Sequence, residues 1–403
     1  MYSATRHLVR QTCRPRLVFR QCHQQAGGDG SDRAGNKVSQ YFNKVLDNPL
    51  PLGVGALVVG VLQWRRIRER EARKEAEAGA AGEAASAAPA WQVTCYRALP
   101  LRHVSRLWGW LNEVELPRLL RPAILGLYAK SFGCVLEEAE CSDLEEYPSL
   151  GQFFRRRLKA GCRTVEAAAS LVSPCDGKVL HWGAVDLTAG VVEQVKGVTY
   201  SLHHFLGPGS GVAAAPGNKL YQCVLYLAPG DYHCFHAPAD WTISSRRHFP
   251  GELLSVSPGV VRRVPSLFCL NERVSYLGTW AHGFFSMTAV GATNVGSVKV
   301  GLDPELDTNT RAWEADTFHQ KTWDKGARVT KGEYFGEFNL GSSIVLVFEA
   351  PEDFKFNFSH EGAIVKVGSS VMVINDENHE ENTEKCIPPI DAGLKSDNAV
   401  IVS

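Results

Sequence analysis

The pattern of hydrophobic positions changes in character near residue 171. Between Leu101 and Lys130, leucine, valine and tryptophan recur at the spacing of one helix face. Pro117 and Pro122 interrupt this stretch, and a proline inside a helical pattern ends or kinks the helix. The stretch therefore predicts two or three short helices.

From Leu171 onward the chain contains short apolar runs separated by glycine and proline. Such runs predict β-strands, and the glycines and prolines between them predict turns. The clearest runs are Gly177–Trp182, Leu220–Leu227, Arg273–Leu277, Thr293–Val300 and Ser343–Phe348. We therefore expect an α+β, β-dominated domain with short helices at its N-terminal side.

The apolar faces of the predicted helices have two interpretations. Packing against the core is the usual role of such a face, which here carries Leu107, Leu116 and Leu119. Trp108 and Trp110, however, lie among several arginines. Tryptophan beside arginine also suits a surface that lies on a membrane, so both roles stay open.

The first 40 residues form a basic segment. Between Met1 and Gly28 arginine recurs and no acidic residue occurs, a composition typical of a mitochondrial transit peptide. A generic basic tail has a similar composition. We expect residues 1–40 to be a transit region.

An apolar segment follows at residues 45–64. Every residue from Pro49 to Leu62 is apolar, glycine or proline, and Trp64 and a group of arginines come directly afterwards. A spanning helix needs about 20 apolar residues, so this run crosses a bilayer only with help from its flanks. The segment predicts a single transmembrane helix or a membrane anchor, the alternatives being an interfacial helix or an apolar part of the transit region.

Composition also sets the limits of the folded part. Residues 65–90 are rich in alanine, glutamate and arginine without an apolar stripe, which predicts a linker. The folded domain is expected at residues 91–375, and residues 376–403 are expected to be a polar tail.

Charge and cysteine content exclude several classes of function. The 43 basic and 43 acidic residues balance, so no overall field attracts nucleic acid, and we expect no such partner. The 11 cysteines contain no Cys-x-x-Cys pair and no histidine partner at zinc-site spacing. We expect no metal site, and no lysine site for pyridoxal phosphate is evident.

Two polar motifs follow predicted strands or turns. Asp176 lies in a turn enforced by Pro174 and Gly177, which by itself is an ordinary feature of β-proteins. His233 and His236 are three residues apart, after the run that ends at Leu227. Their spacing on turning backbone favours acid–base chemistry over metal binding, while a structural role for both histidines stays open.

A third motif places Ser342 directly after Gly341, at the start of a predicted strand. The serine can belong to a plain turn, act as a hydrolytic nucleophile, or attack its own preceding carbonyl group. Hydrolysis is disfavoured because no Gly-x-Ser-x-Gly elbow is present and the serine enters a strand instead of a helix. The turn and the self-attack remain.

Together the three motifs resemble those of the phosphatidylserine decarboxylase family. The resemblance rests on Pro174–Gly177, Asp231–His236 and Leu340–Ser343, with further similarity in residues 148–159, 195–202 and 290–297. It covers roughly residues 147–367, and the basic leader and apolar segment look like the mitochondrial inner-membrane branch. Two departures are Ser343, where the family often has threonine, and the unusual tail.

The resemblance implies an enzyme that cuts itself. Ser342 would attack the carbonyl group of Gly341, and an N→O acyl shift, elimination and hydrolysis would leave a covalent pyruvoyl group made from Ser342. Asp176 and His236 would activate Ser342 as a Ser–His–Asp arrangement, and His233 would act on the substrate. A β chain ending at residue 341 and an α chain of residues 342–403 would remain associated.

The same resemblance implies a substrate and a location. Phosphatidylserine in a bilayer would be converted to phosphatidylethanolamine and CO₂ through an imine between its amine and the pyruvoyl group. The catalytic body would face the intermembrane space from the mitochondrial inner membrane, and a homo-oligomer stays open. Two rivals are a pyruvoyl decarboxylase for a soluble amino acid, which the apolar segment disfavours, and a tethered lipid-binding or scaffolding module.

Overall fold

The computed structural model describes residues 87–186, 191–195, 198–294, 297–311, 313–339 and 341–373. The predicted transit region, the membrane segment at residues 45–64, most of the linker and the polar tail lie outside these residues. Within the described ranges, no helix is both long enough and apolar enough to cross a bilayer.

Short helices come first along the described chain and strands dominate the remainder, so the α+β, β-dominated expectation is confirmed. The helical part contains α3 (Ala90–Arg97), α4 (Leu101–Glu113), η1 (Arg118–Leu120), α5 (Arg121–Phe132), η2 (Leu144–Glu146) and α6 (Leu150–Phe154). Three further helices, α7 (Leu202–Leu206), α8 (Pro258–Val261) and α9 (Leu267–Leu270), lie between strands.

The strands form one large antiparallel sheet and two small ones. The eight-stranded sheet has the order β10 (His319–Val329), β6 (Trp241–Phe249), β7 (Arg273–Trp280), β8 (Gly283–Val290), β12 (Ser342–Pro351), β4 (Asn218–Leu227), β1 (Gly177–Ala184) and β13 (Ile364–Val365). The small sheets are β5 (Cys234–His236), β11 (Tyr334–Phe338) and β9 (Val298–Val300), and the pair β2 (Val191–Val195) and β3 (Val198–Ser201).

Strand β12 lies inside the large sheet and is covered on both faces. Because side chains alternate along a strand, Ile344, Leu346 and Phe348 enter the core shared with the three-stranded sheet. Val345 and Val347 enter a second core, which contains residues of α7, α9 and β3. Burial on both sides explains why this strand reads as a continuous apolar run.

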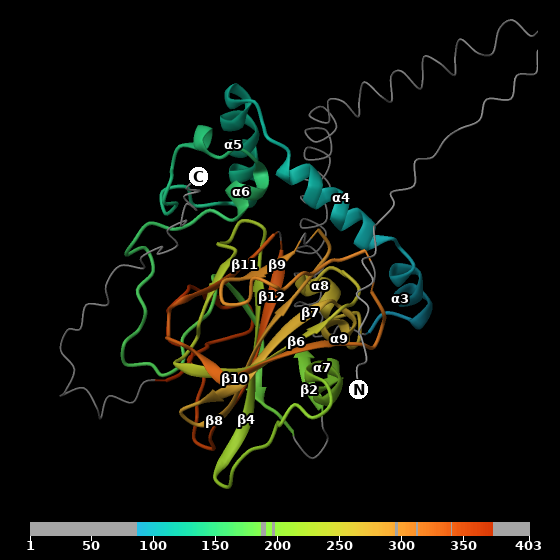
Figure 1. Ribbon diagram of the computed structural model, residues 1–403, viewed down its shortest axis with the longest axis vertical. Helices are drawn as coiled ribbons and strands as arrows, with labels where there is room; N and C mark the ends of the chain where they lie inside the picture. The colour runs from blue at the N-terminus through green and yellow to red at the C-terminus, as the bar shows by residue number, and fades with distance from the viewer. Residues whose placement is uncertain are drawn as a thin grey trace, which may run out of the picture. The chain divides into compact units, whose positions relative to one another are not determined.

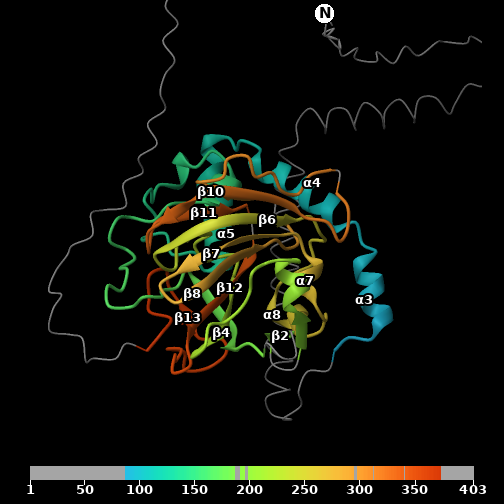
Figure 2. The ribbon, with the colours of Figure 1, turned by 60° about the horizontal axis from the view of Figure 1, so that its bottom comes forward.

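The helical part lies beside the sheets on the side where β9 and β11 are drawn (Figure 1). Helices α7 and α8 lie on another side of the large sheet, next to β2, as the turned view also shows (Figure 2). Helices α5 and α6 have their own small core, which includes Leu125, Phe153 and Phe154. The sheet and the helical part therefore meet near the start of β12, as the contacts below show.

Two local predictions need correction. The strand predicted at Thr293–Val300 begins only at Val298, because Asn294 has a positive φ of 70° and lies in a turn. Pro122 does not interrupt a helix but lies in the first turn of α5. The first turn tolerates proline because its backbone N–H groups have no partner within the helix.

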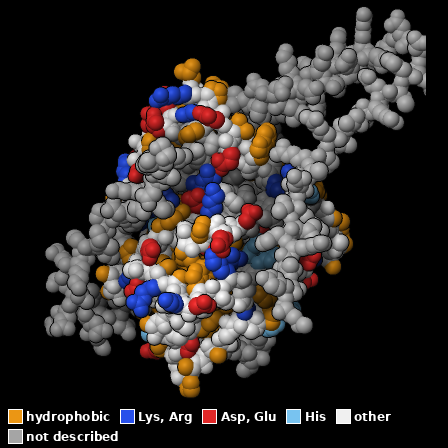
Figure 3. Space-filling model, in the orientation of Figure 1, with side chains coloured by type: hydrophobic (Ala, Val, Ile, Leu, Met, Phe, Trp, Pro, Cys, Tyr) orange, Lys and Arg blue, Asp and Glu red, His pale blue; other side chains and the backbone are white. Residues whose placement is uncertain are grey.

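The apolar faces of the helices are only partly used for packing. Leu116 is buried, whereas Leu107 is 58% exposed and Leu119 is 92% exposed, so only part of the apolar face packs against the core. Trp110 is 53% exposed on the same helical part. Hydrophobic side chains are visible at the surface of this part, next to charged ones (Figure 3).

Candidate functional site

Ser342 is the first residue of β12, and its side chain is fully buried. Its backbone pairs with Leu227 of β4, and the next residue, Ser343, pairs with Tyr226 of β4 and Val290 of β8. The hydroxyl groups of both serines are enclosed and have no hydrogen-bond partner among the described residues. A buried hydroxyl without a partner costs free energy, so both positions need an explanation other than stability.

Gly341 directly precedes Ser342 and has a positive φ of 26°. Glycine adopts positive φ readily because it has no Cβ, whereas other residues are strained there. Outside the neighbouring residues, no atom of the described structure lies within 4 Å of the place where a Cβ would stand. Glycine is therefore required here by the conformation of the backbone.

His233 is a neutral histidine with one unused ring nitrogen. Its Nδ1 lies 2.9 Å from the carbonyl oxygen of Asp231, which can only accept, so Nδ1 carries the proton. Its Nε2 is buried and has no partner in the part of the chain that the structure describes, and its ring lies 3.9 Å from the ring of Phe154, measured between centroids. Burial lowers the pKa of His233 to about 3. The bare Nε2 is thus available as a proton acceptor.

His236 is also buried and neutral, but both of its nitrogens are bonded. Nδ1 donates to the carbonyl oxygen of Gly332 at 2.9 Å, so Nε2 accepts from the hydroxyl group of Tyr232 at 3.2 Å. Burial lowers the pKa of His236 to about 4. The imidazole has the tautomer that a general base needs, although its basic nitrogen is occupied by Tyr232.

Asp176 is a buried carboxylate that two cations hold. It accepts from Arg163 Nη2 at 2.6 Å, from Lys366 Nζ at 3.0 Å and from the backbone N–H of Val367 at 2.9 Å. Burial by itself would raise its pKa, but the hydrogen bonds from Arg163 and Val367 outweigh it and the pKa lies below its usual value. Asp176 is therefore ionised.

Backbone contacts connect the three motifs to one another. The N–H of His236 donates to the carbonyl oxygen of Pro174 at 2.8 Å, which joins β5 to the turn of Asp176. The N–H of Phe338 donates to the carbonyl oxygen of His233 at 3.0 Å, which joins the same region to the segment before Gly341. Within the described structure, however, no hydrogen bond connects Asp176 to His236, or either histidine to Ser342.

A model of the family "Phosphatidylserine decarboxylase" matches residues 150–373, which is more than half of the chain. The chain belongs to the phosphatidylserine decarboxylase family. It is 46% identical over 349 residues to the mitochondrial phosphatidylserine decarboxylase proenzyme of Pongo abelii, covering 80% of this chain and 83% of that protein. The proenzyme of Rattus norvegicus is 46% identical over 334 residues, covering 76% and 80%. Proenzyme 1 of Saccharomyces cerevisiae is 36% identical over 372 residues, covering 70% and 74%.

The resemblance that the sequence motifs indicated is thereby confirmed. The matched residues 150–373 include Asp176, both histidines and the Gly341–Ser342 pair. All three relatives are named proenzymes and all three are named mitochondrial.

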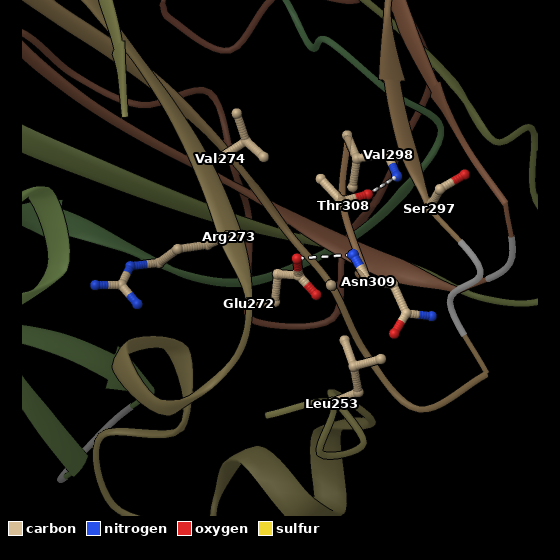
Figure 4. A pocket seen from close by; sticks show the side chains of 9 residues that line it. Leu253, Glu272, Arg273, Val274, Ser297, Val298, Thr308 and Asn309 are labelled. Atoms are coloured by element: carbon tan, nitrogen blue, oxygen red, sulfur yellow. Dashed lines mark hydrogen bonds between the residues drawn. The ribbon is translucent and has the colours of Figure 1, made fainter. Parts of the chain in front are cut away.

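A small pocket adjoins the site of this decarboxylase-family chain at the end of β8. Its lining includes Leu253, Glu272, Gly291 and Asn309 (Figure 4). Gly291 directly follows Val290, the residue that pairs with Ser343. Glu272 accepts from the backbone N–H of Asn309 at 2.8 Å, so part of its charge is already compensated.

Several residues around the motifs gave no signal in the sequence. Arg163 lies 13 positions before Asp176, whereas Lys366 lies 190 positions after it and reaches it only through the fold. Arg155 lies in an arginine run that carries family resemblance but no assigned role, and it contacts Asn339 near Gly341. In the described ranges, no cluster of histidine, cysteine or acidic residues is arranged to hold a metal ion.

Proposed function

We propose that this chain is a self-processing, pyruvoyl-dependent decarboxylase that converts phosphatidylserine to phosphatidylethanolamine and CO₂. The observation that carries the proposal is Ser342, whose buried, unpartnered hydroxyl group follows a glycine with positive φ at the start of a central strand. Family membership and the proenzyme names of the relatives support the same reaction.

The self-cleavage is proposed to begin with attack of Ser342 Oγ on the carbonyl carbon of Gly341. The new C–O bond forms as the C–N bond breaks, which yields an ester and frees the amine of residue 342. Elimination then removes the Cα proton of residue 342 and breaks its Cβ–O bond, which forms a Cα=Cβ double bond and leaves the Gly341 carboxylate at the end of the β chain. Water replaces the nitrogen as ammonia leaves, so the α chain begins with a pyruvoyl group.

His236 is the proposed base for the first step. Its Nε2 carries no proton in the tautomer described, and accepting the Ser342 proton requires it to exchange its bond with Tyr232 for one with the serine. Asp176 is ionised and lies next to the strand that carries His236, so its negative charge favours the protonated imidazole. Asp176 would thus act electrostatically, while the Gly332 carbonyl group orients the ring.

Decarboxylation needs a site that accepts the negative charge left on Cα when CO₂ departs. The pyruvoyl group supplies an electron-withdrawing carbonyl group for this charge. The buried Nε2 of His233 fits such a site, since it has no partner among the described residues and a bound headgroup would provide one. Nε2 of His233 would take a proton from the substrate amine and return it to Cα after CO₂ leaves.

The substrate's acyl chains are proposed to stay in the bilayer while the headgroup enters the protein. The exposed apolar residues of the helical part, including Trp91, Leu107 and Trp110, support a membrane-facing role for this part. We place the protein at the mitochondrial inner membrane with its body in the intermembrane space. The mitochondrial names of the relatives support the organelle.

The measurement that tests the proposal is the intact mass of the mature protein. We expect two fragments, of which the smaller begins at residue 342 and has no free amine. Ser342→Ala should give a single chain without activity, because the attacking hydroxyl group is gone. Ser343→Ala is the matched control and should still be cut. A single chain in active material would contradict the mechanism, and decarboxylation of free serine but not of phosphatidylserine would favour the soluble-substrate rival.

A further inference from the structure

Asn339, which lies two residues before Gly341, is fixed through both its backbone and its side chain. Its backbone N–H donates to the carbonyl oxygen of Ser297 at 2.9 Å, and its Nδ2 donates to Ser297 Oγ. Its Oδ1 accepts from Nη1 of Arg155. A carboxamide oxygen only accepts and its nitrogen only donates, so these partners select one orientation of the side chain.

Arg155 connects Asn339 to the helical part of the molecule. The same Nη1 donates to Oε1 of Glu113 at 2.6 Å, and Nη2 lies 3.4 Å from Oε2 of this glutamate. Glu113 is the last residue of α4, and Arg155 directly follows α6. The Arg155 side chain is only 15% exposed, so its bonds are better shielded from water than those of a surface pair.

The bond that is proposed to break lies between two fixed points of the backbone. On one side Asn339 is held by Ser297 and Arg155. On the other side Ser342 is paired with Leu227 in the large sheet. Only Leu340 and Gly341 lie between them, and a connection this short leaves few arrangements of the Gly341 carbonyl group. An intramolecular attack is fast only when the reacting atoms are held close and aligned.

We propose that Arg155 is a positioning residue for self-cleavage, which acts by fixing Asn339 and thereby the Gly341 carbonyl group relative to Ser342. This inference rests on the proposed self-processing. Arg155 touches none of the reacting atoms. Its planar guanidinium group binds Glu113 and Asn339 at the same time, which the single ammonium group of a lysine does less well.

The test follows self-cleavage of the full chain after cell-free synthesis, with the two fragments measured over time. We expect Arg155→Gln to slow cleavage by about tenfold to a hundredfold, the size of effect that small misplacements of reacting groups produce. Arg155→Lys should restore part of the rate because it can still donate to Asn339. Arg118→Gln is the matched control, since Arg118 pairs with Glu145 and Glu146 but does not contact the cleavage segment.

A second readout separates positioning from a general loss of structure. Hydroxylamine cuts the ester that follows the acyl shift, so a variant with a slow shift should yield little additional cut chain when hydroxylamine is added. The rate of decarboxylation by Arg155→Gln, divided by the amount of pyruvoyl-bearing α chain, should stay within about twofold of the parent rate. Catalysis after the cut no longer depends on how the Gly341 carbonyl group is aligned with Ser342. Thermal unfolding of Arg155→Gln in a Ser342→Ala background reports its effect on stability.

The outcomes are distinguishable. If the parent chain cuts and Arg155→Gln cuts equally fast, the positioning role is wrong and the proposed function stands. If the parent chain does not cut at all, the proposed function itself fails.

If Arg155→Gln does not fold, Ser297→Ala takes its place, because it removes only the hydroxyl group that accepts from Asn339. Slower cutting by that variant at an unchanged melting temperature supports the inference, and an unchanged rate contradicts it.

Discussion

At the scale of single residues, the two histidines are alike in charge and differ in what their basic nitrogen contacts. Burial keeps both imidazoles neutral, yet Nε2 of His233 has no partner among the described residues while Nε2 of His236 is bonded to Tyr232. The free nitrogen suits a group that must bind an incoming molecule. The bonded one suits a group that acts once, during maturation, and then keeps its structural contact.

The lowered pKa values of the two histidines predict how the stability of the folded protein depends on pH. The pKa values of His233 and His236 in the folded protein are about 3 and about 4, below the value of 6.5 for an unperturbed histidine. As pH falls below 6.5, the unfolded chain takes up protons that the folded protein refuses, so stability decreases between about pH 6.5 and pH 4. Asp176 contributes only at lower pH, because its folded pKa lies below the usual 3.8.

The measurement is urea unfolding of the uncut Ser342→Ala protein at a series of pH values. We expect the free energy of unfolding to decline across this window. In His236→Asn the decline should be smaller, because one of the two titrating groups is absent. A parent protein whose stability is constant from pH 6.5 to pH 4 would contradict the buried, neutral state of both rings.

At the residue scale, the sequence motifs identified the residues that carry the proposed chemistry but not those that hold them. Asp176, His233, His236 and Ser342 belong to short motifs that are visible locally. The contact between Lys366 and Asp176 spans 190 positions, so it depends on how β1 and β13 pair. The residues next to Lys366 in the sequence do not indicate that it pairs with Asp176.

At the scale of elements, β12 is the strand on which the large sheet depends. It pairs with β4 along its whole length and with β8 over its first part. Its apolar run made it easy to predict, as were β1, β4 and β7. The start of β9 was misplaced because the turn at Asn294 depends on a positive φ, which the apolar pattern around it does not reveal.

A core substitution in β12 should therefore be costly. Leu346 is fully buried in the core between the two sheets, and Leu346→Ala should lower the free energy of unfolding by about 2–5 kcal/mol. Ile364→Ala is the control, because Ile364 of β13 is 72% exposed, and its effect should stay within about 0.5 kcal/mol. Urea unfolding in the Ser342→Ala background measures both, and equal effects would contradict the central position of β12.

At the scale of the whole molecule, the helical part has a side that contacts the sheets and a side that is exposed. On the inner side Arg102 of α4 bonds to Glu272, a residue of the pocket lining, and Glu113 bonds to Arg155. On the outer side apolar side chains such as Trp110 are exposed. The sequence pattern showed the amphipathic character but left open which face would be covered, because that depends on where the sheet lies.

The exposed side should bind lipid. Trp110→Glu should weaken binding of the uncut Ser342→Ala protein to vesicles that contain phosphatidylserine by about thirtyfold, since burying a large apolar side chain contributes about 2 kcal/mol. Ile364→Glu adds the same charge at an exposed apolar position outside the helical part and should leave binding unchanged. Co-sedimentation with vesicles gives both values. Equal loss in the two variants would indicate a general charge effect instead of a docking face.

The position of β12 has a consequence for when an active molecule can first exist. The strand starts at the residue that is proposed to become the new terminus, and both of its neighbours in the sheet come from earlier in the chain. A ribosome must therefore deliver the strand before the sheet can close and the cut can occur. A message truncated shortly after codon 342 would yield neither a folded body nor the reactive group, and a finished molecule, once cut, has no route back to its precursor.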